Sequence, residues 1–469
     1  MIDSNTSEET GVGNYFISNY PQYSFWKPEF VKNVHDVLNS SAPSNPLPLG
    51  LYFHIPFCRK RCHFCYFRVY TNKKASEINA YIDSGIKEIE KYGNTPYLSG
   101  RKPKFIYFGG GTPSYLSVPQ LRDLTDRMKA VFPWDEAEEV AFECEPGTLT
   151  EKKLDAIRKL GVTRLSLGVE NLNDHILEIN GRAHRSMEIK RAYKYARNIG
   201  FPQINIDLIA GMIDETEENW KDCVRQAIDL SPECVTIYQM EIPYNTTIYK
   251  EMKESGKLTA PVADWPTKRR WVSEAFDMFV EAGYTVTSAY TVVKDPQKVK
   301  FVYRDALWGG ADMLGTGVAS FGHIGGVHVQ NEHDIGTYLT RVTDNEYPIY
   351  RAYPTNEDET LIREFILQLK LGKVNLSYFK KKFNADILKR FQSTLNDLQQ
   401  QKFLTFDDNS IEMSRDGLLQ VDWILHDFFL NEHWPFIKPE SCRAFGQHGS
   451  ALMNGRIAQP GSANISDLM

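Results

Sequence analysis

The chain has 469 residues, a length that allows two or three domains at about 150 residues per domain. With 42% apolar and 24% charged residues, it has the composition of an ordinary globular protein that can bury a large core. The formal net charge of −6 provides no broad basic surface, so we expect no nucleic-acid partner.

The first residues lack a basic region followed by an apolar run, so no secretory signal is expected. No stretch approaches the roughly 18 consecutive apolar residues of a transmembrane helix. Cys144, Cys223, Cys234 and Cys442 are scattered singly along the chain, a pattern typical of a reducing compartment rather than of a disulfide framework. We therefore expect a cytoplasmic protein.

Residues 1–48 end in a Pro/Ser-rich stretch and are expected to form an N-terminal extension and linker. Over residues 49–350, short apolar segments alternate with segments of helical periodicity. The expected strands are Leu51–Ile55, Phe105–Phe108, Val140–Glu143, Arg164–Gly168, Ile204–Ile209, Cys234–Gln239 and Tyr284–Ala289. The expected helices are Ser76–Lys91, Gln120–Val131, Thr150–Leu160, Ser186–Asn198, Glu215–Leu230 and Thr267–Ala282. This alternation predicts about six parallel βα units, and a full barrel of eight units is the alternative.

The pattern changes near Pro354, and residues 351–431 are expected to form a second, mainly helical domain. Its expected helices are Asp358–Leu371, Leu376–Lys382, Ile387–Gln401 and Asp416–Phe429, with a hairpin of Phe403–Phe406 and Ser410–Met413. Residues 432–469 are rich in Gly, Ser and Pro and weakly patterned, so we expect a loose tail there.

Three of the seven cysteines, Cys58, Cys62 and Cys65, follow the first expected strand in a C-x3-C-x2-C spacing. Iron–sulfur clusters are held by cysteine thiolates, normally four for a [4Fe–4S] cube, so three thiolates leave one iron open for a substrate or cofactor. A zinc site pairs C-x2-C with a distant second pair, which does not follow here. The spacing therefore favours an iron–sulfur cluster over a zinc site or three unrelated cysteines.

This spacing resembles that of the radical S-adenosylmethionine (SAM) superfamily. The preceding Tyr52-Phe53-His54-Ile55-Pro56-Phe57 narrows the resemblance to the oxygen-independent coproporphyrinogen III oxidases and their relatives, the HemN/HemW-like family, which includes class C radical SAM methyltransferases. The resemblance implies an α/β fold with a partial barrel of six βα units and a winged-helix-like C-terminal domain. It also implies a [4Fe–4S] cluster and one or two SAM molecules as cofactors, with reductive cleavage of SAM to a 5′-deoxyadenosyl radical.

The resemblance assigns SAM contacts residue by residue. The glycine-rich family motif that follows the second strand matches Gly109-Gly110-Gly111-Thr112-Pro113, and the segment around Glu241 matches a second SAM site. The expected cofactor contacts are Tyr52, Phe64, Gly110, Gly111, Thr112, Glu143, Glu170, Arg182, Asp207 and Glu241. No residue can be assigned to the catalytic hydrogen transfer.

The chain departs from the family pattern at three positions. Glu170 replaces a glutamine, and an ionised carboxylate only accepts hydrogen bonds. Glu145 replaces an asparagine or aspartate, and we expect it to be a solvated or helix-capping carboxylate. Phe67 stands where the oxidases carry a fourth cysteine, and in this respect the chain is similar to the haem-chaperone and haem-degrading branches and to the class C methyltransferases.

On these grounds we expect a class C methyl or alkyl transfer to an unsaturated or aromatic small molecule. One alternative is tetrapyrrole chemistry, either oxidation of coproporphyrinogen III or opening of the haem ring. A second is a haem-binding chaperone with little turnover. A reducing partner such as flavodoxin or ferredoxin is expected, whereas the sequence determines neither the substrate nor the oligomeric state.

Overall fold

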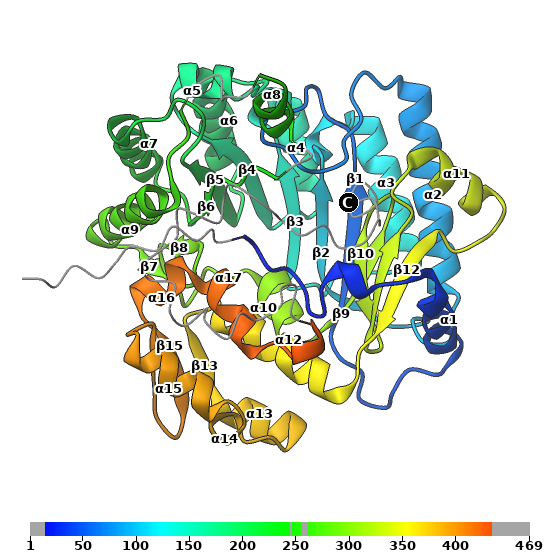
Figure 1. The fold of residues 1–469 in the computed structure, drawn as a ribbon. Coiled ribbons are helices and arrows are strands. Elements are labelled where there is room, and N and C mark those ends of the chain that lie inside the picture. Colours follow the sequence, from blue (N-terminus) through cyan, green and yellow to red (C-terminus); the bar gives the residue numbers. More distant parts are fainter. Residues whose placement is uncertain (1–14, 244–245, 256–260, 434–469) are drawn as a thin grey trace, which may run out of the picture.

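The structure, a computed structural model, describes residues 15–243, 246–255 and 261–433. Within these residues a 12-stranded sheet has the order β12-β11-β10-β9-β1-β2-β3-β4-β5-β6-β8-β7 (Figure 1). Its strands are β1 (Leu49–Ile55), β2 (Pro103–Gly110), β3 (Glu139–Cys144), β4 (Arg164–Glu170), β5 (Gln203–Ala210), β6 (Cys234–Gln239), β7 (Thr285–Val286), β8 (Thr291–Val293), β9 (Asp312–Thr316), β10 (Phe321–Ile324), β11 (Val327–Asn331) and β12 (Ile349–Pro354).

Strands β1 to β6 pair in chain order, and every pair is parallel. The helices between and after them are α2 (Ala75–Gly93), α3 (Val118–Val131), α4 (Glu151–Lys159), α5 (Asp174–Ile179), α6 (Ser186–Asn198), α7 (Glu217–Leu230), α8 (Thr247–Ser255) and α9 (Trp265–Glu281). The isoleucine spacing that predicts α2 is confirmed, because Ile78, Ile82, Ile86 and Ile89 are all buried. The six expected βα units of a partial barrel are thus present.

The expected strand Tyr284–Ala289 is wrong in extent and direction. Only Thr285–Val286 is extended, as β7, and it pairs antiparallel with β8, which in turn pairs antiparallel with β6. The backbone turns back after β7, so this segment is a hairpin beside β6 and adds no further parallel unit.

The region 301–354, for which the sequence pattern predicted no elements, extends the sheet on its other side. Helix α10 (Val302–Trp308) precedes β9, which pairs parallel with β1, and β10 to β12 follow as antiparallel strands. Helix α11 (Ile335–Thr343) connects β11 to β12. Strand β12 crosses the domain boundary expected between residues 350 and 351, and helix α1 (Val31–Asn39), in the expected extension, packs against it.

The C-terminal elements surround a three-stranded sheet of order β13-β15-β14. They are α12 (Glu357–Leu369), β13 (Lys373–Asn375), α13 (Leu376–Phe383), α14 (Ile387–Arg390), α15 (Gln392–Gln400), β14 (Leu404–Phe406), β15 (Ser410–Met413), α16 (Arg415–Leu419) and α17 (Val421–Ile424). The short 3-10 helices of the chain are Tyr23–Phe25, Pro28–Phe30, Pro113–Tyr115, Pro146–Thr148, Leu425–Phe428 and Asn431–His433.

Two long helices expected here are interrupted by tertiary contacts. The expected Ile387–Gln401 breaks at Phe391 (φ −110°), whose ring stacks on Phe365 with centroids 5.2 Å apart. The expected Asp416–Phe429 breaks at Gln420 (φ −122°), next to Leu419, whose carbonyl accepts a hydrogen bond from the Gln239 amide of the barrel at 3.1 Å. The rest of this expected helix becomes α17 and a 3-10 turn.

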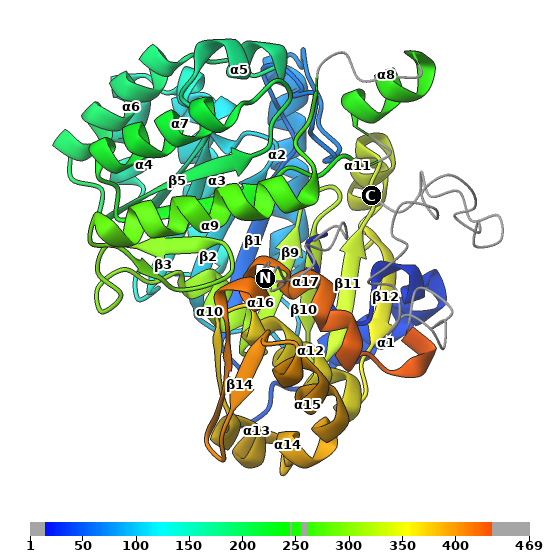
Figure 2. The same ribbon diagram turned by 60° about the vertical axis from the view of Figure 1, so that its left-hand side comes forward.

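The barrel and the C-terminal elements have hydrophobic cores of their own. Figures 1 and 2 show α12 to α16 at the end of the barrel opposite α5, the helix that directly follows β4. Residues 434–469, which include nearly all of the expected loose tail, lie outside the described residues. No helix in the described part of the chain combines the length and the apolar character that crossing a membrane requires.

Candidate functional site

The candidate site lies at the carboxyl ends of the parallel strands. The cysteine loop connects β1 to α2, Gly110 and Gly111 end β2, and Glu143 and Glu170 lie at the ends of β3 and β4. Parallel strands bring their carboxyl ends to one edge of a barrel, which is where ligands bind in such folds. The expected residues, which are far apart in the sequence, therefore lie close together at this edge.

Two side-chain donors point at the cysteine sulfurs. The Thr112 hydroxyl donates to Cys58 Sγ at 3.3 Å, and Arg182 Nη1 donates to Cys62 Sγ at 3.1 Å. A Cβ atom at Gly111 would lie 3.0 Å from Cys58 Sγ, so the backbone can approach this sulfur only at a glycine. The Cys65 amide donates to the Cys62 carbonyl at 3.2 Å, which folds the loop back on itself.

Burial raises the pKa of the Cys58 thiol to about 11 and that of Cys65 to about 12. Thiols with a raised pKa stay protonated until a metal supplies the positive charge, and a coordinating metal deprotonates them outright. Hydrogen bonds aimed at the sulfurs are a further common feature of iron–sulfur sites. The three thiols and their donors therefore fit a cluster.

Within the described residues, no three His, Cys, Asp or Glu side chains converge closely enough for a single metal ion. A mononuclear zinc site needs its ligands around one point, whereas a cluster spreads its iron atoms over a wider space. The arrangement thus gives no support to the zinc alternative.

The expected SAM residues Glu143 and Asp207 are partly buried hydrogen-bond acceptors, at and just below the same edge. Glu143 accepts hydrogen bonds from the Tyr107 hydroxyl at 2.7 Å and from the Gly110 amide at 3.1 Å. Asp207 accepts from Ser166 Oγ and Asn205 Nδ2, each at 2.9 Å. Burial raises the pKa of Glu143 to about 7 and shifts the pKa of Asp207 upward as well.

Glu170 and Arg182 form an ion pair at the end of β4. Arg182 Nη2 lies 3.5 Å from Glu170 Oε1 and donates to the Gly168 carbonyl at 2.5 Å. Glu170 has a φ of +64°, and burial raises its pKa to about 7. Arg182 Nε is buried without a hydrogen-bond acceptor in the described residues, so the guanidinium retains one donor for a ligand carboxylate. Together with the nearby carboxylates, which favour a cation, this donor fits a zwitterionic, sulfonium-bearing molecule such as SAM.

The remaining expected residues differ in how closely they join this group. The Tyr52 hydroxyl lies 3.0 Å from His54 Nδ1, and its ring stacks on Tyr107 with centroids 5.9 Å apart, so it lies beside Glu143's hydrogen-bond partner. Phe64 packs against a small apolar cluster that includes Met240. Glu241, just after β6, accepts the Phe16 amide at 2.9 Å and is therefore engaged with the N-terminal segment.

Three residues around the site were missed or misread at the level of sequence. Glu145 caps the turn at Pro146–Thr148, as expected, but it is only 9% exposed and not solvated. It accepts from His184 Nδ1 at 2.8 Å and lies 3.3 Å from Arg59 Nη2. These side chains come from three separate loops, and no local motif signals their meeting.

The chain is similar to known proteins in both sequence and fold. Residues 52–227 match the model of the Radical SAM superfamily, and residues 356–419 match that of the HemN C-terminal domain. The heme chaperone HemW of Bacillus subtilis is 28% identical over 374 residues, which cover 78% of this chain and 96% of that protein. The oxygen-independent coproporphyrinogen III oxidase of Escherichia coli is 25% identical over 393 residues, which cover 80% and 84%.

Among solved structures, coproporphyrinogen III oxidase (HemN) from Escherichia coli, a radical SAM enzyme, matches with a TM-score of 0.76. The match covers 88% of this chain and 96% of that one at 23% identity. It shows that the barrel and the C-terminal elements share the fold of that enzyme.

Proposed function

We propose that this chain, which belongs to the radical SAM superfamily and carries a HemN C-terminal domain, acts on a tetrapyrrole. The observation that carries the proposal is the nearly full-length similarity to a heme chaperone and to a coproporphyrinogen III oxidase. Both relatives handle tetrapyrroles, as their names state. The radical SAM family uses a [4Fe–4S] cluster and SAM, and the thiols and partly buried carboxylates of the site fit both.

The preference for methyl transfer expected from Phe67 is not supported. The relatives compared above are an oxidase and a chaperone. Tetrapyrrole chemistry and haem binding, which the sequence offered as alternatives, are therefore preferred to methyl transfer. Methyl transfer remains testable because it alone produces S-adenosylhomocysteine.

In the proposed site Cys58, Cys62 and Cys65 would hold the cluster, which together with bound SAM would supply the radical chemistry for hydrogen abstraction. Arg182 and Thr112 donate hydrogen bonds to the thiolates. Glu143 holds the Gly110 amide in place while its buried charge attracts the cationic part of SAM. The free Arg182 Nε is available to the carboxylate of SAM.

A second candidate, a haem-binding chaperone, is favoured by one observation. Phe67 is 48% exposed, and its ring lies 4.5 Å from that of Tyr66, directly after the last cluster cysteine. An exposed phenylalanine ring supported by a partly buried tyrosine offers a stacking surface to a flat macrocycle. The same position in the oxidases carries a cysteine, so the two candidates differ at this residue.

We further propose a reducing compartment and a flavodoxin or ferredoxin as electron donor. The six described cysteines are free, and a low-potential donor of this kind matches the chemistry of the cofactor. The chain thus needs no disulfide for stability in its described part.

The test is product analysis of anaerobically reconstituted protein with SAM and dithionite, with either coproporphyrinogen III or haem added. We expect 5′-deoxyadenosine to rise with one of the two tetrapyrroles. Haem binding at one equivalent without any 5′-deoxyadenosine would favour the chaperone. S-adenosylhomocysteine formed in step with 5′-deoxyadenosine, independent of either tetrapyrrole, would overturn the proposal in favour of methyl transfer.

A further inference from the structure

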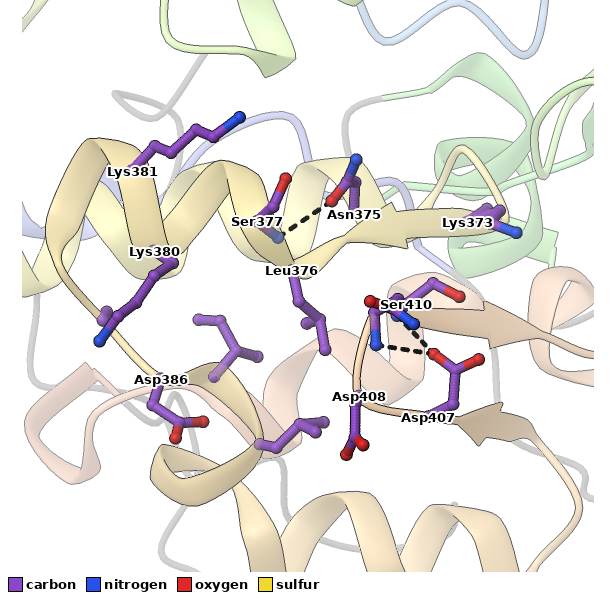
Figure 3. A pocket seen from close by; sticks show the side chains of 14 residues that line it. Lys373, Asn375, Leu376, Ser377, Lys380, Lys381, Asp386, Asp407, Asp408 and Ser410 are labelled. Atoms are coloured by element: carbon purple, nitrogen blue, oxygen red, sulfur yellow. Dashed lines mark hydrogen bonds between the residues drawn. The ribbon is translucent and has the colours of Figure 1, made fainter.

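Two pockets lie away from the cysteine loop, and their charges differ. One of about 810 Å³ lies in the C-terminal elements between α13, α14 and the β14–β15 turn (Figure 3). Three of its six charged residues have partners within the chain: Lys373 pairs with Glu412, Asp386 caps α14, and Asp407 accepts the Asn409 and Ser410 amides. Because the six comprise three lysines and three aspartates, this pocket indicates no particular ligand.

The other pocket, of about 420 Å³, lies at the opposite end of the barrel from the cysteine loop. Arg164 and Cys234, the first residues of β4 and β6, form part of its wall, and α10 and the loop before it form another part. Glu143 and Asp207 lie at or near the other ends of their strands. Arg164 lies two residues below Ser166, the strand partner of Glu143, and four below Gly168, the partner of Asp207. Roughly 7 to 13 Å of strand therefore separate this pocket, which we call the floor pocket, from the proposed SAM site.

A buried arginine forms the inner wall of the floor pocket. Arg164 is 1% exposed and donates to Gln203 Oε1 at 3.2 Å and to Cys234 Sγ at 3.4 Å. Among the described residues no carboxylate lies within 4.0 Å of its guanidinium. Glu139 and Asp207 interact with Arg164 only at longer range, and the oxygens of Glu139 already accept the Val302 and Tyr303 amides. Burying a guanidinium without a paired anion is costly.

A second guanidinium is held near the first by the same ring. The Arg164 Cζ atom lies 4.2 Å from the Phe301 centroid and the Arg304 Cζ atom 5.7 Å from it. Arg304 also pairs with Asp305 at 2.8 Å, whereas Arg164 and the exposed Lys300, which also line the pocket, have no carboxylate within 4.0 Å among the described residues. Like charges gathered in one cavity raise its free energy unless an anion enters.

The rest of the wall is apolar and includes Val293, Val299 and Leu371. A bare inorganic anion would leave most of a cavity of about 420 Å³ unfilled, whereas an acid with a hydrocarbon body would contact both kinds of wall. We propose that the floor pocket binds a small organic anion, with its carboxylate or phosphate between Arg164, Lys300 and Arg304 and its apolar body on Val293, Val299 and Leu371. This site goes beyond the proposed function and does not depend on it.

The test is calorimetric titration of the full-length protein at low ionic strength with hexanoate, hexyl phosphate and hexanol. We expect saturable one-to-one binding of at least one of the two anions and none of hexanol. Hexanoate alone would identify a carboxylate site, and hexyl phosphate alone a phosphate site. Absence of saturable binding by both anions would overturn the proposal, as would equal binding of hexanol.

Variants on the exposed side of the pocket separate a built site from a general charge effect. Arg304→Gln is expected to weaken binding of the anion at least about tenfold, and Lys300→Gln by a smaller factor. Lys298→Gln is the matched control, because Lys298 lies two residues before Lys300, pairs with Asp295 and has a side chain that is 84% exposed. Weakening of the same size in Lys298→Gln, with Arg304→Gln no worse, would overturn the proposal. These variants leave Arg164 in place, so loss of folding does not confound the result.

Discussion

The two ends of the barrel carry opposite charge although the same strands build both. At the carboxyl ends Glu143, Glu170 and Asp207 are partly buried acids, whereas Arg164, Lys300 and Arg304 line the floor pocket. Side chains two or four residues apart on a strand share a face and differ only in depth. A single barrel interior can therefore present a cation-binding end and an anion-binding end, and the position of a residue along its strand decides to which end its side chain belongs.

The largest effect is expected from Cys62→Ala. Loss of one thiolate should abolish the broad iron–sulfur absorbance and the formation of 5′-deoxyadenosine, while hexanoate or hexyl phosphate binding at the floor stays unchanged. Cys223→Ala is the control, because Cys223 is a free, buried cysteine of α7. Retention of the absorbance in Cys62→Ala would mean that Cys62 is not a ligand of an iron–sulfur cluster.

Glu143→Gln should weaken SAM binding to the reconstituted protein by roughly 10- to 100-fold, the range of a charged hydrogen-bond partner. The amide cannot attract the cationic part of SAM. Glu139→Gln, four residues deeper on β3, should leave the dissociation constant of SAM unchanged when both are measured by calorimetry. Equal losses in the two variants would contradict the separation by depth.

The acidic end should respond to pH and the floor should not. Burial raises the pKa of Glu143 to about 7, so this carboxyl is mostly neutral at pH 6 and ionised at pH 8. SAM affinity should therefore rise about tenfold from pH 6 to pH 8, as expected for one carboxylate that must be ionised to bind. The arginines of the floor keep their charge over this range. A pH profile that persists unchanged in Glu143→Gln would assign the titration to another group.

Phe67→Cys should have the smallest effect, because Phe67 lies on the exposed side of the cysteine loop, beyond the three cysteines. The side chain is 48% exposed, so the free energy of unfolding should change by no more than about 0.5 kcal/mol. The iron content and the absorbance spectrum should match those of the unchanged protein. A different spectrum would mean that the cysteine introduced at position 67, where the oxidases carry their fourth cysteine, reaches the cluster.

Local pattern was enough to predict the parallel part of the fold. The isoleucine periodicity of α2 and the short apolar strands β1 to β6 each lie within one segment, and so does the cysteine spacing. The region 301–354 was not predictable in this way, because β9 is a strand by virtue of pairing with β1, far away in the sequence. The break at Phe391 likewise depends on Phe365, a distant ring.

The residues of the candidate site were likewise predictable only where a local motif indicates them. The family motifs indicated Glu143, Arg182 and Asp207, and the structure brings them to the edge that holds the cysteines. Glu145 was interpreted as solvated because nothing in its own segment reveals His184 or Arg59. The basic floor was missed for the same reason, since Arg164 and Arg304 are joined through the ring of Phe301.

The pairing of β1 with β9 has a consequence for how the chain is made. β1 leads into the cysteine loop, and its Tyr52 pairs with Gly315 of β9, so the strand obtains its second neighbour only about 260 residues later. At typical synthesis rates of about 5 to 20 residues per second, this interval lasts roughly 13 to 50 s. During it the three cysteines are attached to an unfinished sheet. Iron and sulfide delivered during synthesis would therefore meet an incomplete barrel, whereas iron and sulfide delivered after release of the chain would meet a complete one.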